Sequence, residues 1–124
     1  MDFKENPAIY IQIAEYVCDQ ILLKKWKMGN RLISTRDLAI NMEVNPNTVQ
    51  RAYDFLQQRE IIVNKRGIGY FIEDCAMNRI LVFRREQFIE NELPVFFKNI
   101  YLLKIDFKVI KTMFEQFVKE NFNN

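Results

Sequence analysis

Histidine is absent from this chain of 124 residues, and its only cysteines are Cys18 and Cys75. A Cys/His zinc site and a histidine-based catalytic triad therefore cannot be built from these residues. We interpret both thiols as small buried side chains, and we leave a redox role open. Because a Gly-rich phosphate loop and a diagnostic carboxylate pair are also missing, the sequence predicts neither a cofactor, a metal site nor an enzyme.

Long apolar runs are missing as well, since none reaches the roughly 18 to 20 residues that a membrane-spanning helix requires. The start of the chain, Met1-Asp2-Phe3-Lys4-Glu5, does not have the basic and then apolar pattern of a signal peptide. Glycine and proline occur only three times each, which argues against disorder and against a fibrous repeat. We expect a compact, helix-rich protein of the cytoplasm with no membrane partner.

Positive charge is concentrated in one part of the chain. The net charge of the whole sequence is only +2, which by itself does not indicate nucleic acid. Residues 24–66, however, contain nine Lys and Arg against four Asp and Glu, a net charge of +5. An ordinary solvated surface is the alternative reading of such charges.

Two consecutive helices are predicted in the middle of the chain. Ser34, followed three residues later by Asp37, approximates a capping box and predicts a helix of about two turns. Asn45 and Pro46 are typical of the start of another helix, because Asn caps free amides and Pro is tolerated in the first turn. Two helices joined this tightly form a helix-turn-helix.

The helix before this pair is predicted to be scaffold. It opens at Pro7 and ends near Lys25, and its apolar residues recur at intervals of four. These residues are Ile9, Ile13, Val17 and Ile21.

The second helix of the pair is predicted to have two different faces. A helical wheel places Val49, Ala52, Tyr53 and Leu56 on an inner arc. The opposite side, here called the outer arc, consists of Asn47, Thr48, Gln50, Arg51 and Asp54. Asn and Gln can pair with adenine and Arg with guanine, so the outer arc has the chemistry of major-groove recognition, although any surface helix also exposes polar residues.

A β-hairpin is predicted directly after this helix. Its strands are Ile61–Val63 and Tyr70–Ile72, and Gly67 and Gly69 allow the turn between them. Lys65 and Arg66 at the tip can reach phosphates or an adjoining minor groove. A hairpin with merely solvated charges is the alternative.

Residues 7–72 together resemble the winged helix-turn-helix of the GntR family of bacterial transcription regulators. Residues 7–13 resemble the family's opening Pro-x-Tyr-x-Gln-Ile signature, and residues 34–39 resemble its Ser-x-Arg-Asp/Glu-Leu-Ala step. Residues 48–56 resemble its recognition helix, and residues 67–72 resemble its wing. The resemblance implies DNA contacts from Arg36, Asn45, Asn47, Thr48, Gln50, Arg66 and Gly67. We add Arg51 from the helical wheel and Lys65 from the hairpin tip.

The chain also departs from the family pattern. Asn45-Pro46 stands where the family often has Ser/Thr-Arg, and Glu60 stands where a glycine is common ahead of the first strand. One frequent DNA-contacting arginine is therefore absent, and the operator sequence is not given by these residues.

The rest of the chain is predicted to be helical and apolar. Residues 77–93 and 95–122 are helical in composition, with interruptions at Pro94, which either kinks one long helix or begins a second, and at residues 104–106, where Asp106 can cap a last helix. We favour two principal helices, the first of which is bent at Pro94. Apolar residues recur at helical spacing and form a stripe on each segment. They are Ile89, Leu93, Phe96, Ile100 and Leu103 in one segment and Phe107, Ile110, Phe114 and Phe117 in the other.

This excess of apolar surface favours a homodimer, since a second copy would remove it from water. Packing of the tail on its own winged domain is the alternative. A short two-helix tail also resembles the YtrA-type subfamily, which implies a small homodimeric regulator, often of a transporter operon. A small-molecule effector is left open because no residue identifies one.

The predicted fold class is mainly α with a small β wing. We expect a winged helix-turn-helix domain over residues 1–73 and an α-helical dimerisation domain over residues 74–124. The predicted function is sequence-specific regulation of transcription by a homodimer on an inverted repeat in double-stranded DNA. We favour a repressor, because occupying a promoter needs no further surface for polymerase. The alternative is a winged-helix module that docks a protein and has no sequence-specific DNA binding.

Overall fold

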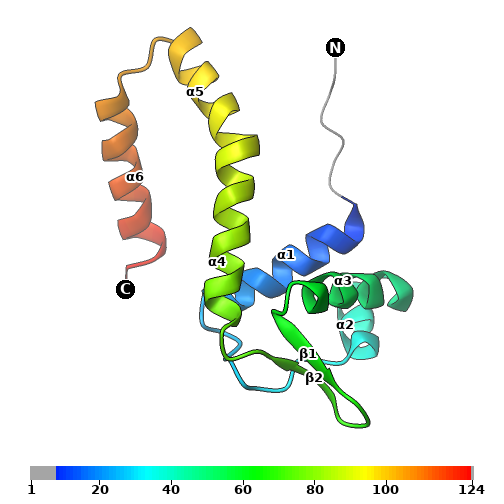
Figure 1. The fold of residues 1–124 in the computed structure, drawn as a ribbon. Coiled ribbons are helices and arrows are strands. Elements are labelled where there is room, and N and C mark those ends of the chain that lie inside the picture. The colour runs from blue at the N-terminus through cyan, green and yellow to red at the C-terminus, as the bar shows by residue number, and fades with distance from the viewer. Residues whose placement is uncertain (1–7, 124) are drawn as a thin grey trace. The chain divides into compact units, whose positions relative to one another are not determined.

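The computed structural model describes residues 8–123, which divide into a compact unit ending at Phe83 and another beginning at Arg84. We call these the winged unit and the tail unit (Figure 1). The elements that begin in the winged unit are α1 Ile9–Leu22, α2 Thr35–Met42, α3 Pro46–Gln58, β1 Ile62–Lys65, β2 Gly69–Ile72 and α4 Ala76–Gln87. Together with the tail helices they confirm the predicted fold class, mainly α with a small β wing.

The core of the winged unit lies between α1 and α3, and α2 packs on α3. The whole predicted inner arc of α3 is buried, which leaves its outer arc for other molecules. Ile13, Val17 and Ile21 of α1 are buried as predicted, but Ile9 is 58% exposed. The prediction was wrong for Ile9, because this first residue of α1 borders an open groove instead of the core. Cys18 is buried, whereas Cys75 is only half-buried.

Both predicted helix caps are present. Ser34 Oγ accepts the Asp37 N–H over 3.1 Å, and Asn45 Oδ1 accepts the Asn47 N–H over 2.8 Å. Between them, Glu43 has a φ of 56°, a left-handed conformation that ends α2 and lets the chain turn within three residues. These caps and the left-handed residue between them determine where α3 begins. The first helix, in contrast, ends at Leu22 and not near Lys25, because Lys24 has a φ of 62°.

The predicted hairpin is an antiparallel pair in which Ile62 faces Ile72 and Lys65 faces Gly69. Its strands extend one to two residues closer to the tip than the sequence predicted. Arg31 forms an additional bridge with Phe71, and the Leu32 N–H donates to Tyr70 O over 2.8 Å. The hairpin is therefore attached to the segment before α2 as well as to the end of α3.

Glu60, the residue that replaces a common family glycine, has a φ of 59°. This left-handed conformation is unfavourable for a residue with a Cβ atom. Arg79 of α4 donates to Glu60 O over 2.7 Å and lies 3.5 Å from the Glu60 carboxylate. The contact between α4 and the end of α3 thus helps to hold a backbone turn for which glycine would be the usual choice.

The tail unit contains η1 Phe88–Glu92, α5 Leu93–Leu102 and α6 Phe107–Asn121. The irregular turn η1 has π-helical geometry and precedes Pro94, at the place where the sequence predicted a bend. Proline has no N–H and its ring collides with the carbonyl four residues earlier, here Glu90, so the irregularity falls before the proline. Asp106 caps α6 by accepting the Lys108 N–H over 2.9 Å, as predicted.

Tyr53 connects the core to the segment before α2. Its hydroxyl donates to Ile33 O over 2.7 Å, and its ring meets Tyr70 edge-to-face at 5.1 Å. Burial, and secondarily the neighbouring Tyr70, raises the pKa of Tyr53 far above its usual value. The phenol therefore stays protonated and keeps donating at every pH at which the protein is commonly handled.

Tyr53→Phe is expected to lower the free energy of unfolding by about 1 kcal/mol, because a carbonyl loses its hydrogen-bond partner. Urea denaturation at pH 7 measures this difference, and Tyr101→Phe on α5, where Tyr101 is 82% exposed, is the control that should change nothing. Because the folded pKa is raised, the advantage of Tyr53 over Phe is full below about pH 10 and declines at higher pH. Equal stabilities of Tyr53→Phe and the parent chain would contradict the role of this bond.

Candidate nucleic-acid interface

The outer arc of α3 is accessible to another molecule along its whole length. Asn47, Arg51 and Asp54 are exposed, whereas Thr48 and Gln50 are half-buried. Arg36 is exposed in the first turn of α2. The predicted contact residues of both helices are thus placed at the surface, and none of them is part of the core.

Asn45 has a structural task besides its predicted DNA contact, because its side-chain oxygen caps α3. Asn45→Ala is expected to lower the free energy of unfolding by about 1 kcal/mol, while Asn45→Ser keeps an oxygen at the cap and should remain near the parent value. Urea denaturation of the three proteins measures this. If the serine variant is stable but binds DNA more weakly, the amide also contacts DNA; equal losses of stability in both variants would contradict the capping role.

Arg51 is held against α1. Its guanidinium lies 4.0 Å from the ring centroid of Tyr10, close enough for a cation–π interaction. A groove of about 380 Å³ runs beside this pair and is lined by Ala8, Ile9, Tyr10, Asn45, Asn47, Thr48 and Arg51. The structure therefore brings four of the predicted contact residues together at the start of the recognition helix. Sequence reasoning missed Tyr10 as the support of Arg51, although Tyr10 lies within the quoted opening signature.

Gln50 is attached to the wing. Its Nε2 donates to Tyr70 Oη over 2.8 Å and to Asp54 Oδ1 over 3.0 Å. Tyr70 belongs to β2, so this amide joins the recognition helix to the hairpin across 20 residues of sequence. Nothing in the spacing of the sequence indicates that these two side chains meet, and the sequence analysis gave Tyr70 no role beyond the strand.

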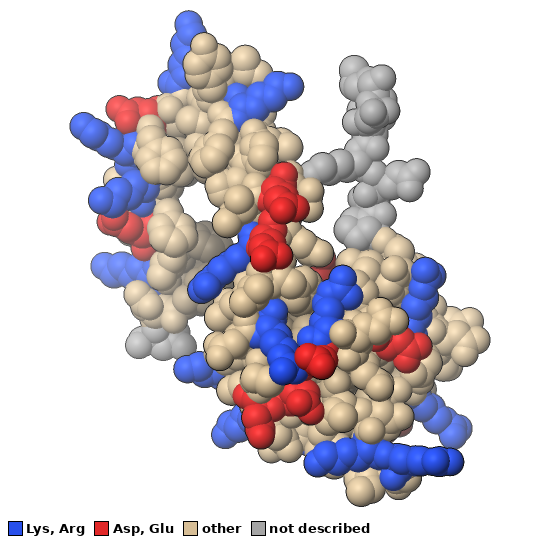
Figure 2. All heavy atoms as spheres, in the orientation of Figure 1, with Lys and Arg blue, Asp and Glu red and all other residues tan. Residues whose placement is uncertain are grey.

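The tip of the wing is a tight turn with two cationic residues. The Ile68 N–H donates to Lys65 O over 2.9 Å, and Gly67 has a φ of 79°, which a residue with a Cβ atom resists. Arg66 is exposed, and Lys65 Nζ lies 4.3 Å from the centroid of the Phe71 ring. Figure 2 shows Lys and Arg side chains extending from the part of the surface where the β1–β2 connection lies.

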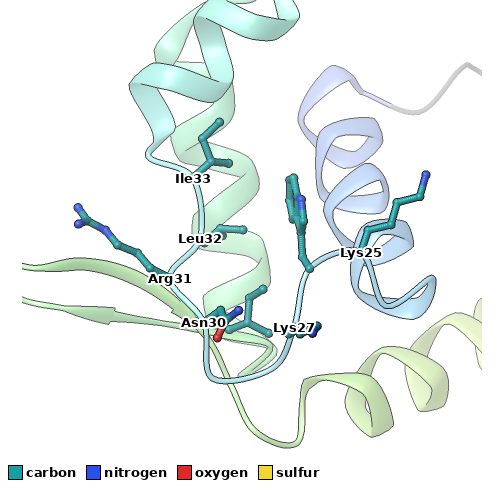
Figure 3. Close-up of a pocket in the computed structure, with 8 residues that line it drawn as sticks. Lys25, Lys27, Asn30, Arg31, Leu32 and Ile33 are labelled. Atoms are coloured by element: carbon teal, nitrogen blue, oxygen red, sulfur yellow. The ribbon is translucent and has the colours of Figure 1, made fainter.

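A second cavity of about 320 Å³ lies between the end of α1 and the wing. Lys25, Lys27 and Arg31 are among its lining residues, which would suit an anion if they converged. In Figure 3, however, the side chains of Lys25 and Arg31 point in opposite directions. These cations offer no common position for one small ligand, and no effector is inferred from this cavity.

Within residues 8–123, no group of three or more His, Cys, Asp or Glu side chains could hold a metal ion. In the same part of the chain, no helix has both the length and the apolar character required to cross a membrane.

Two similar proteins from one bacterium are named as regulators of transcription. The HTH-type transcriptional regulator YhcF of Bacillus subtilis (strain 168) is 38% identical over 74 residues, which cover 60% of this chain and 61% of YhcF. The HTH-type transcriptional repressor YtrA of the same organism is 35% identical over 81 residues, which cover 65% of this chain and 62% of YtrA. The chain thus aligns with less than two thirds of the length of these relatives.

A crystal structure of a transcriptional regulator of the GntR family from Bacteroides thetaiotaomicron has a TM-score of 0.71 and 42% sequence identity to this chain. The match covers 91% of this chain and 98% of that one. Similarity to YtrA agrees with the predicted YtrA-type subfamily, and the names of the relatives indicate regulators and not enzymes. The model of the family described as bacterial regulatory proteins, gntR family, matches residues 9–72, more than half of the sequence, and the chain therefore belongs to this family.

Proposed function

We propose that this chain is a sequence-specific DNA-binding regulator of transcription that acts as a homodimer on an inverted repeat. The observation that carries the proposal is the polar outer arc of α3, none of whose residues is buried, beside a cationic wing tip in a chain of the gntR family. Such side chains can read base edges in the major groove, while Lys and Arg neutralise phosphates. A protein that works on bacterial DNA acts in the cytoplasm.

Each predicted contact residue receives a specific role in this proposal. Arg36 and the groove residue Arg51 bind phosphates or adjacent base edges at the start of α3. Asn47, Thr48 and Gln50 read bases, with Asn45 at the rim. Lys65, Arg66 and the backbone of Gly67 hold the flanking DNA. The support is their surface position and their chemistry.

The homodimer is supported by the apolar surface of the tail. No residue of α5 or α6 is buried, and Phe107, Phe114 and Phe117 are each more than half exposed. The other stripe residues are exposed or half-buried: Ile89, Leu93, Phe96, Ile100, Leu103 and Ile110. When a partner removes apolar surface of this kind from water, the assembly is stabilised by roughly 25 cal/mol per Å². A second copy of the chain offers the same stripes and is the occupant that we propose.

A two-fold dimer also fits the target. Two recognition helices related by a two-fold axis meet two half-sites that form an inverted repeat. Linking two weak contacts in one molecule raises the overall affinity by about 10² to 10⁴-fold without any new contact. In this proposal, residues 1–73 bind DNA and residues 74–124 form the contact between the two subunits.

We favour repression of transcription over activation. Blocking a promoter requires only occupancy of DNA, and the relative YtrA is named a transcriptional repressor. A transporter operon is the target that the subfamily resemblance implies. The alternative role as a protein-docking module would need an apolar patch on the outer arc, but Phe55 at its edge is half-buried and covered by Arg59 at 3.6 Å.

The proposal is tested by titrating the purified chain with its own upstream intergenic DNA and by selecting bound fragments from random duplexes. We expect nanomolar-range binding, an enriched inverted repeat and a half-site spacing near one helical turn or a multiple of it. A chain that stays monomeric and retains no duplex even at low salt would contradict both the function and the assembly.

A further inference from the structure

The side chain of Gln50 is fixed at one end. Its amide nitrogen donates to the Asp54 carboxylate and to the Tyr70 hydroxyl. Carboxylate oxygens only accept hydrogen bonds, so the nitrogen and not the oxygen of the amide must face Asp54. An amide nitrogen carries two hydrogens, and these two bonds use both of them.

These two hydrogen bonds limit the hydrogen bonds that Gln50 can form with a base. A free glutamine reads adenine with two bonds, an N–H donated to N7 and an oxygen that accepts from N6. With both hydrogens of Nε2 engaged, only the oxygen Oε1 is left for DNA. In the major groove, adenine N6 and cytosine N4 are the donors, whereas guanine and thymine present acceptors there.

We propose that Tyr70 and Asp54 convert Gln50 into an acceptor-only reader, which admits adenine or cytosine at one position of each half-site and rejects guanine and thymine. This inference rests on the proposed function, and it concerns the specificity of the same surface. Tyr70 is a positioning residue in this scheme, since it acts on the base through Gln50.

The Tyr70 hydroxyl is well placed to hold the amide before DNA arrives. The Tyr70 ring meets the Tyr53 ring edge-to-face, with an interplanar angle of 83°. Tyr53 is in turn anchored to Ile33 O, and the backbone of Tyr70 accepts the Leu32 N–H. Because these supports lie in the core and in the sheet, the amide does not have to be reoriented by the ligand.

Selection from random duplexes with the full chain, Tyr70→Phe and Gln50→Ala tests the proposal. The parent chain should enrich adenine and cytosine similarly at one position, and Gln50→Ala should flatten that position. Tyr70→Phe keeps the ring but frees one hydrogen of the amide, so adenine should then exceed cytosine there by about fivefold or more, the weaker end of bidentate discrimination. Tyr101→Phe removes a hydroxyl from the tail and should reproduce the parent preference.

Asp54→Ala provides an independent test, because Asp54 is exposed and its removal frees the other hydrogen without touching the core. It should shift the same position towards adenine. Circular dichroism confirms that each variant is folded. Unchanged base preferences in both Tyr70→Phe and Asp54→Ala, or a Gln50→Ala variant that flattens no position, would overturn the inference while leaving DNA binding intact. Failure of the parent chain to enrich any motif would instead overturn the proposed function.

Discussion

Phe114→Glu should separate the proposed dimer and weaken operator binding by about 10² to 10⁴-fold, the advantage that joining two half-site contacts provides. Phe114 lies on α6 and is 64% exposed in the single chain. A carboxylate at this position would have to be desolvated in an apolar interface, at a cost that packing of the neighbouring side chains cannot offset. Sedimentation equilibrium and titration of a palindromic duplex measure the two effects.

The matched control is Thr112→Glu, which adds the same charge two residues away on α6. Thr112 is exposed but lies off the predicted stripe of Phe107, Ile110, Phe114 and Phe117, so this variant should remain dimeric. Binding to a single half-site should be similar for both variants, because neither residue belongs to the winged unit. A Phe114→Glu protein that still sediments as a dimer would show that this stripe is not the interface.

The winged unit was predictable because its signals are local. Ser34 and Asn45 bind amides two or three residues away, so their side chains mark the helix starts in the sequence itself. Val49, Ala52, Tyr53 and Leu56 recur at helical spacing, and all four are buried. The family motifs add the order of the elements, which periodicity alone does not supply.

The contacts that organise the candidate interface were not predictable in the same way. Gln50 and Tyr70 are separated by 20 residues, and Arg51 reaches Tyr10 in a different helix. Such pairs depend on how α3 is placed against α1 and the wing, and spacing within one element carries no information about this. The same holds for Glu60, whose backbone is supported by Arg79 of α4.

In the tail, the sequence predicted where helices form but not what covers them. Asp106 and Pro94 mark a helix start and an irregular turn correctly, because both effects are local. The apolar stripes, in contrast, are exposed or half-buried in the single chain, and we propose that a second copy covers them. A pattern of this kind indicates that a partner covers the surface. It does not indicate how the two partners pack against each other.

The double variant Lys65→Ala/Arg66→Ala should reduce the salt dependence of operator binding more than any other pair of changes on the wing. Lys65 is the last residue of β1 and Arg66 follows it in the β1–β2 connection, and both are exposed. If each contacts one phosphate, a dimer loses four contacts, and the slope of log K against log salt should become less steep by about 3.6. Binding titrations between low and moderate salt measure this slope.

Lys111→Ala/Lys119→Ala on α6 removes the same charge from exposed positions of the tail and serves as the control. Its slope should stay close to that of the parent chain, because charges that touch no phosphate release no counterions on binding. The wing variant should also lose affinity to a similar extent for specific and random duplexes, since phosphate contacts carry no sequence information. A wing variant with the parent slope would place the tip away from the DNA and would leave α3 and Arg36 as the principal contacts.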